Sequence, residues 1–535
     1  MSAQQSLPNA EGALPKNSKD SSSNSPIPHK NPSVEHLRRK KLAGWESAIA
    51  RALEGGSPST KILLWAIVDG VLVGAVIGLF RLITGILVQY VRDFYVYIRG
   101  GHWWWLILIV AVSLAASFFI AWITRSAPLV AYSGAADVEE RLHSFNPDWW
   151  NWWRLLWRKF VGGTLALSSG LYLGCEGPSI QMGATVGLAL TNSSKFTKEH
   201  RRELVAAGLA AGLAAAFTAP IAATLFLIEG DYLNRGKFQY PLRTILASFA
   251  ASVASGYMTL LILGTTPDFV LINPSHLALH RYWELLPIGI GCGILGYAYE
   301  KTLAWGIAVY DKLHIPHRLR MFIPLMLSVP IGLFFPATLG DGSFLAKTLA
   351  QDTARVSIWL LLIYIVLRLI FAQVSYGSGA PSGIFLPICS LGIIYGLFCG
   401  KIFAALHLAP ASLPYYSLMG VACLGGLFGS VIKKPLTAVV LAVEVTSFSD
   451  LRVIAIITVI SYFVTGIIDR VDKQIAERKG GAHSSEGDLP SQEEKDVGND
   501  SASIQNLIDK DDLDIDDILD NSDKIDEKDI YDQEL

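Results

Sequence analysis

One carboxylate stands in an apolar stretch where a charge is costly. Residues 171–187 read LYLGCEGPSIQMGATVG, with Glu176 flanked by Gly174 and Gly177 and followed by Pro178. Glycine permits a tight turn and proline suits the first turn of a helix, so the spacing predicts a turn that feeds a helix N-terminus. The unpaired N–H groups of such a terminus favour an anion. We therefore expect the carboxylate of Glu176 to occupy an anion site, from which a mobile anion displaces it once protonation removes its charge.

A second glycine-rich turn, GSGAPSGIFLP (377–387), also leads into an apolar segment and carries no charge. Backbone amides near Ile384 and Phe385 are predicted to coordinate an anion there. Amides suit this task, because a full positive charge at low dielectric would hold the anion too tightly for it to leave.

A third candidate segment, SAPLVAYSGAADVEERL (126–142), ends an apolar stretch and places Ser133 beside Gly134. The Ser133 hydroxyl is expected to donate to the anion. A serine near a helix end also serves as a cap, and the segment alone does not distinguish the two roles.

The composition indicates the elements that must hold these turns. The 535 residues are 51% hydrophobic and 17% charged, whereas charged residues make up about a quarter of a soluble domain. The windows 63–80, 103–123 and 358–372 are long and almost uncharged. The sequence therefore predicts an all-α polytopic membrane protein. Irregular backbone at membrane depth survives where it is buried or lines a polar cavity, so the glycine and proline breaks point to a transport site.

An internal repeat is visible in two pairs of segments. GCEGPS (174–179) aligns with GSGAPS (377–382), and APIAATLFLIE (219–229) aligns with KPLTAVVLAVE (434–444). Two pairs in the same order favour a duplication, an architecture that places binding at the membrane midplane.

The repeat halves are predicted at about 60–265 and 282–475. The repeat-related acids Glu229 and Glu444 are expected to pair structurally, at a helix end or a subunit interface. Arg368, inside an apolar segment, is expected to satisfy buried carbonyl groups.

Polar tails flank the predicted transmembrane domain of residues 46–476. Residues 1–45 are rich in Ser, Asn and Pro and are predicted to be disordered. The basic cluster HLRRKK (36–41) places this tail in the cytosol by the positive-inside rule. Residues 477–535 are predicted to form an acidic, disordered cytosolic tail. The expected location is the plasma or inner membrane.

Several function classes lack a supporting motif. The five cysteines contain no CxxC pair, the eleven histidines show no metal-ligand spacing, and no phosphate-binding or dinucleotide-binding glycine loop opens a helix. We expect no enzyme activity, no metal, no cofactor and no nucleic-acid partner.

GCEGP (174–178) and GIFLP (383–387) resemble the signature loops of the CLC family of chloride channels and proton/chloride antiporters. The resemblance covers most of residues 60–475. It implies a homodimer with an anion pathway in each subunit, both termini in the cytosol, and an inverted repeat of tilted, partly broken helices. The transported ions would be chloride alone in a channel, or chloride and protons in an antiporter.

The resemblance also implies residue roles. Glu176 matches the gating glutamate of the family, and Ser133 falls where its central-site serine lies. Ile384 and Phe385 match the positions whose amides coordinate the anion, and Lys159 in RKFVGG matches a supporting lysine. A serine at the central site is the pattern expected for chloride.

This chain departs from the family pattern at several positions. Cys175 replaces the usual basic residue, and the first loop reads YSGAA (132–136) instead of GSGIP. Gly230 stands where antiporters have a second, proton-relaying carboxylate; Asp231 either replaces it or is a solvated loop residue. The position of the central tyrosine falls near Ile475. We expect no counterpart of the paired regulatory domains of the family, because the segment after residue 476 is short and acidic. Channel and antiporter both stay open.

Two other classes stay open as well. A secondary carrier for another anion or a small organic solute would need a larger polar cavity than these Gly/Ala/Ser-rich segments provide. A receptor or scaffold would accommodate the acidic tail but leaves Glu176 without a role.

Overall fold

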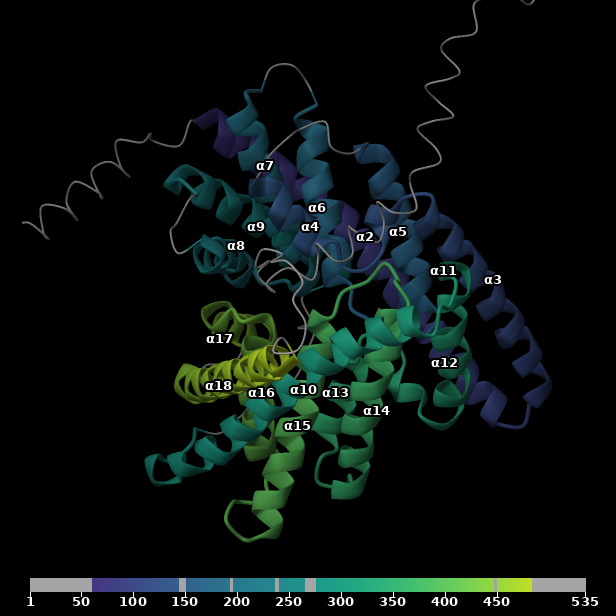
Figure 1. Ribbon diagram of the computed structural model, residues 1–535, viewed down its shortest axis with the longest axis vertical. Helices are drawn as coiled ribbons and strands as arrows, with labels where there is room; N and C mark the ends of the chain where they lie inside the picture. The colour runs from purple at the N-terminus through teal and green to yellow at the C-terminus, as the bar shows by residue number, and fades with distance from the viewer. Residues whose placement is uncertain are drawn as a thin grey trace, which may run out of the picture. The chain divides into compact units, whose positions relative to one another are not determined.

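The computed structural model describes residues 60–143, 151–192, 196–235, 240–264, 276–446 and 450–483 (Figure 1). The described helices belong to one compact unit. Within the described ranges every regular element is helical, and the β contact there is an isolated bridge between Gly174 and Gly383. The predicted all-α class is confirmed. The predicted N-terminal tail lies outside the described residues, as does the chain after residue 483.

The first half of the chain contains helices of different lengths joined by short turns. Its elements are α2 (Thr60–Arg99), η1 (Trp103–Trp105), α3 (Leu106–Arg125), η2 (Pro128–Val130), α4 (Ala135–His143), α5 (Trp152–Ser168), α6 (Glu176–Leu190), α7 (Lys198–Phe217), α8 (Pro220–Arg235) and α9 (Leu242–Leu263).

The second half continues with η3 (Leu279–Glu284), α10 (Leu285–Lys312), α11 (His317–Arg320), α12 (Phe322–Phe334), η4 (Pro336–Thr338), α13 (Ser343–Gln351), α14 (Ile358–Gly377), α15 (Phe385–Ala405), α16 (Leu413–Ile432), α17 (Pro435–Thr446) and α18 (Leu451–His483). The last helix extends beyond residue 476, where the transmembrane domain was predicted to end.

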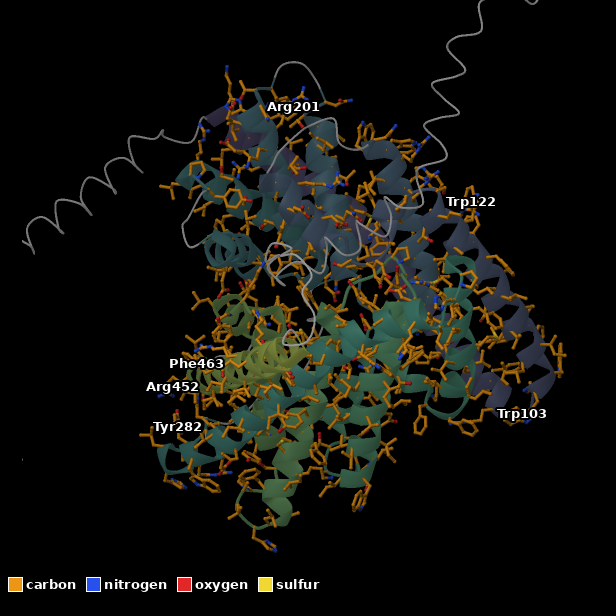
Figure 2. The ribbon with its side chains drawn as sticks, in the orientation of Figure 1. Trp103, Trp122, Arg201, Tyr282, Arg452 and Phe463 are labelled. Carbon is orange, nitrogen blue, oxygen red and sulfur yellow. The ribbon has the colours of Figure 1, made fainter. Side chains whose placement is uncertain are left out.

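Seven spans among the described helices are long and apolar enough to cross a membrane; they lie in α2, in η1 with α3, and in α9, α14, α15, α16 and α18. Shorter apolar helices, among them α8 and α17, could not span a bilayer alone. Large apolar side chains cover the outside: Trp122 and Phe463 point away from the helical body and are 55% and 58% exposed (Figure 2). An apolar exterior of this kind suits lipid.

The two repeats align through the turns that begin α6 and α15. Gly174 and Gly383 each donate an N–H to the carbonyl of the other at 2.7 Å. The helix starts two residues later in both, so GCEGP corresponds to GIFLP. The predicted alignment of 174–179 with 377–382 was therefore wrong in register. Gly377 still belongs to α14, and Gly379, at φ +82°, ends that helix.

The second predicted pair of repeat segments is confirmed. Thr218 caps the C-terminus of α7 and Lys433 that of α16, both in the left-handed conformation (φ 55° and 58°). Two residues later Pro220 and Pro435 begin α8 and α17, because proline suits the first helical position.

Helices α8 and α17 lie side by side, and each supplies an acid to the N-terminus of the other (Figure 1). Glu229 of α8 accepts the N–H and the hydroxyl of Thr437, each at 2.8 Å. Glu444 of α17 accepts the N–H groups of Ile221 and Ala222 at 3.0 and 2.8 Å. The structural pairing expected for the two acids is a reciprocal capping of helix ends, as a two-fold relation between the repeats produces.

Removal of one of these acids should weaken the fold measurably. Glu229→Ala leaves buried amide and hydroxyl donors of α17 without acceptors, which should cost about 1–3 kcal/mol of stability. The apparent melting temperature in detergent should fall by several degrees. Glu300→Ala is the control, because Glu300 forms an exposed ion pair with Lys433, worth less than about 1 kcal/mol. Equal shifts for the two variants would contradict the capping role.

Candidate functional site

Glu176 begins α6, and its side chain is fully buried. Its Oε1 accepts the N–H of Leu386 at 2.6 Å, while Oε2 has no hydrogen-bond partner in the described part of the chain. Leu386 lies in the first turn of α15, so the acid of one repeat contacts the N-terminus of the equivalent helix in the other. The carboxylate thus lies at a helix N-terminus; that this place is an anion site stays a prediction.

Two glycines make room for this carboxylate. A Cβ on Gly174 would overlap the carboxyl group of Glu176, and the three nearest atoms all belong to that group. A Cβ on Gly383 would lie 2.5 Å from Oε2 of Glu176 and 2.6 Å from the backbone nitrogen of Gly177. The paired glycines thus form a bare backbone surface against which the acid lies.

Ser133 and Gly134 lead into α4 beside the same site. A Cβ on Gly177 would come within 2.5 Å of Ser133 Oγ, so the serine lies against the first turn of α6. Ser133 Oγ also accepts a long contact from the N–H of Ala135, at 3.4 Å, as a cap would. Gly134 has a left-handed φ of +69° and packs against Gln181. The N-termini of α4, α6 and α15 therefore meet around Glu176.

Lys159 supports this junction without facing Glu176. It is fully buried in α5, and its Nζ donates to the carbonyl oxygens of Val130 and Tyr132 at 2.9 and 2.8 Å. The carbonyl of Tyr132 also accepts the N–H of Ser382 at 3.0 Å. Lys159 thus fixes the segment that carries Ser133, which is consistent with the supporting position predicted for it.

Ile384 precedes α15 and Phe385 is its first residue. Their N–H groups belong to the first-turn amides that have no acceptor within a helix. The amide that contacts Glu176 is that of Leu386, one residue beyond the predicted pair. The ring of Phe385 packs against Phe226 and Phe428, with centroids 5.7 and 5.3 Å apart.

Arg368 is fully buried in α14 and donates to one carbonyl, that of Thr338 at 3.2 Å, as predicted. It also donates to the hydroxyls of Tyr172 and Ser390 at 2.9 and 2.7 Å, which the sequence did not indicate. Tyr172 in turn donates to the carbonyl of Pro387 at 2.7 Å. These contacts hold the first turns of α15 in place.

Sequence reasoning missed Tyr299 of α10. Its side chain is fully buried, and its hydroxyl has no partner among the described residues. It lies within electrostatic range of Glu176 and Arg368. The sequence signal for Tyr299 was weak, because it consists only of a tyrosine three residues after Gly296. In the structure, Gly296 packs closely against Ser430.

An ion pair packs against Gly230, in the space that a side chain at this position would occupy. A Cβ on Gly230 would lie 2.6 Å from Nζ of Lys434 and 3.5 Å from Oε1 of Glu139, and these two atoms are 2.9 Å apart. The side chain of Asp231 lies outside the described residues. Ile475 is 47% exposed on α18 and offers no hydroxyl. At Gly230 and Ile475, the structure therefore supplies neither the relay carboxylate nor the tyrosine that the family pattern has at these two positions.

Helices of two repeats that break off around a buried acid define a membrane protein of the inverted-repeat class. A family model described as voltage gated chloride channel matches residues 116–466. The chain belongs to this family, the CLC family, as the signature loops predicted. The H(+)/Cl(-) exchange transporter ClcA of Vibrio vulnificus is 32% identical over 412 residues, which cover 75% of this chain and 85% of the relative. ClcA of Salmonella paratyphi A is 30% identical over 439 residues, 79% and 88% of the two chains.

Solved structures agree with this assignment. A slow cyanobacterial Cl-/H+ antiporter superposes with a TM-score of 0.69 at 26% identity, covering 76% of this chain and 94% of the other. A CLC-type fluoride/proton antiporter, at 22% identity, shares the fold with a TM-score of 0.61 over 76% of this chain and 95% of the other.

The contact between Gly174 and the carboxyl of Glu176 can be tested by a double-mutant cycle. Gly174→Ala should destabilise the protein by about 1–3 kcal/mol, because the added methyl overlaps the acid. In a Glu176→Ala background the same change should cost much less, since the overlapping atoms are gone. Melting temperatures of the four proteins measure the coupling.

Gly383→Ala provides the contrast, because its methyl would also meet the backbone nitrogen of Gly177. Its cost should persist in the Glu176→Ala background. Strictly additive effects of Gly174→Ala and Glu176→Ala would show that the acid does not lie against Gly174.

Proposed function

We propose that this protein exchanges protons for chloride across a membrane, with Glu176 binding the proton and occupying the chloride site in turn. The observation that carries the proposal is the hydrogen bond from the N–H of Leu386 to the carboxylate of Glu176, buried between helix N-termini. The relatives support the proposal, because the ClcA proteins and the cyanobacterial antiporter are named as exchangers of protons and chloride.

The geometry explains how one side chain handles both ions. As a carboxylate, Glu176 is held by the amide of Leu386 and by the partial positive charge of the helix ends. A proton neutralises the carboxylate and weakens this hold, so the side chain rotates away and chloride takes its place at the bare amides. When the proton leaves, the carboxylate returns and displaces chloride. Competition for one place couples the two ions.

Chloride can also leave this site, because no cationic side chain is bonded to Glu176 among the described residues. Arg81, whose charge acts on Glu176, donates to the carbonyl of Ala215. Lys159 and Arg368 are both occupied by carbonyl or hydroxyl groups. Partial charges of helix ends and the Ser133 hydroxyl then set the affinity, which permits rapid exchange. The serine supports chloride as the anion.

An uncoupled chloride channel is the second candidate. The observation in its favour is Gly230, which has no side chain to relay protons and faces the ion pair of Lys434 and Glu139 instead.

The rest of the proposal concerns assembly and location. We propose a homodimer in the plasma or inner membrane, with both termini in the cytosol and no cofactor. The basic cluster at 36–41, before the first span, supports the orientation.

Glu176→Gln tests the proposal directly. Glutamine keeps an oxygen that accepts the N–H of Leu386 but cannot bind and release a proton. In proteoliposomes, chloride flux should persist, while proton uptake driven by a chloride gradient should fall at least about tenfold. Radioactive chloride and a pH electrode measure the two fluxes. The control is Glu300→Gln, at an exposed ion pair.

Coupled proton uptake that survives in Glu176→Gln would contradict the role of Glu176. Wild-type protein that conducts chloride without moving protons would favour the channel.

A further inference from the structure

Asp69 lies in the middle of the apolar part of α2 and is fully buried. Neither of its carboxylate oxygens has a hydrogen-bond partner among the described residues. A Cβ on Gly208 would lie 3.1 Å from Asp69 Oδ2, so the carboxyl group points at α7. An isolated carboxylate at low dielectric is costly, and an intramembrane acid of this kind calls for a functional explanation.

A line of buried hydroxyls leads towards Asp69 along α9. Thr244, Ser248 and Ser252 follow one another at four-residue intervals, all buried, and none of their hydroxyls has a partner in the described structure. The line begins beside Arg243, which is 30% exposed and forms an ion pair with Glu203 of α7 at 2.5 Å. The hydroxyls therefore start beside a partly exposed ion pair and continue into the interior.

The register of the helices brings the acid to this line. Helix α2 packs on α9 so closely that a Cβ on Gly70 would overlap the carbonyl of Ala251. Asp69, one residue earlier, is therefore level with the turn between Ser248 and Ser252. The side chains of Asp69, Ser248 and Ser252 are all buried where α2, α7 and α9 pack together.

The second repeat shows that the packing itself does not need an acid here. On α10, Gly289 packs against α18 at Ile460 and the carbonyl of Ile457, a place that corresponds to the contact of Gly70 with Ala251 in the first repeat. The counterpart of Asp69 is then Ile288, a buried aliphatic residue. The carboxylate is thus a feature of one repeat only.

A short route connects Asp69 with the site of Glu176. Helices α6 and α7 touch at Gly183 and Gly208, where a Cβ on either residue would overlap the other backbone. Gly183 follows Glu176 by two helical turns, roughly 10 Å along α6. Ser179 lies between them, with its carbonyl against Gly212.

Other charges on these helices stand apart from Asp69 in sequence. On α6 the charged residue is Glu176, on α9 it is Arg243, and on α7 the last charged residue is Glu203; on α2 the flanking charges are Lys61 and Arg81. Arg81 donates to the carbonyl of Ala215 at 2.7 Å.

We propose that Asp69 is a second proton-binding site, which loads Glu176 from the membrane face where α2, α7 and α9 begin. A proton passes from that face along the α9 hydroxyls and intervening water to the Asp69 carboxylate. Asp69 then releases it, through water and Ser179, to the carboxylate of Glu176, and is left ionised until the next proton arrives. The inference rests on the proposed exchange function and gives the proton a route that avoids Gly230.

Asp69→Asn in proteoliposomes tests the route, because asparagine has nearly the same shape and cannot carry a proton. Chloride flux should stay within about twofold of wild type, while the number of protons moved per chloride should fall at least about tenfold. The matched control is Asp93→Asn, an exposed acid on the same helix, which should keep the wild-type ratio.

Asp69→Ile provides a second variant, since the other repeat carries Ile288 at this place; it should show the same selective loss. A wild-type ratio in either variant would overturn the proposal, and so would equal losses of chloride and proton flux, which indicate a structural role. If wild-type protein moves chloride without protons, the exchange function itself fails and the Asp69 route with it. If wild type is coupled and Asp69→Asn is coupled too, only the Asp69 route fails.

Discussion

The contact between the carboxylate of Glu176 and the N–H of Leu386 joins the two halves of the chain at the point where their helices break off inside the protein. An open helix end inside an apolar body needs an anionic or hydrogen-bonding partner, because its first amides have no acceptor of their own. Here the partner is an acid from the other repeat. The bare turns at Gly174 and Gly383, the loop of Ser133 and the brace of Lys159 all maintain this arrangement.

The same interaction recurs in a permanent form at Glu229 and Glu444. These acids contact two or more donors each, whereas Glu176 uses one oxygen and leaves the other without a partner in the described structure. One type of contact therefore serves two purposes. Where it is fully satisfied it holds the repeats together, and the half-satisfied contact of Glu176 is the one that we propose to exchange with an ion.

Much of this was readable from local sequence. The broken helices, the place of Glu176 in a turn and the structural role of Glu229 and Glu444 at helix ends follow from residue types and spacing. The repeat register did not, because 377–381 and 383–387 both read Gly-x-x-x-Pro and only the packing of α14 distinguishes them. The surroundings of Asp69, Tyr299 and Gly230 were also out of reach, since their neighbours come from helices distant in the chain.

The crossed caps of α8 and α17 bear on how the protein is made. The donor Thr437 follows its acceptor Glu229 by 208 residues. At a synthesis rate of about 5–20 residues per second, that interval corresponds to roughly 10–40 seconds on the ribosome. During that time Glu229 of the first repeat lacks its hydrogen-bond donors from α17. The contact between the repeats can therefore form only after α17 has been synthesised.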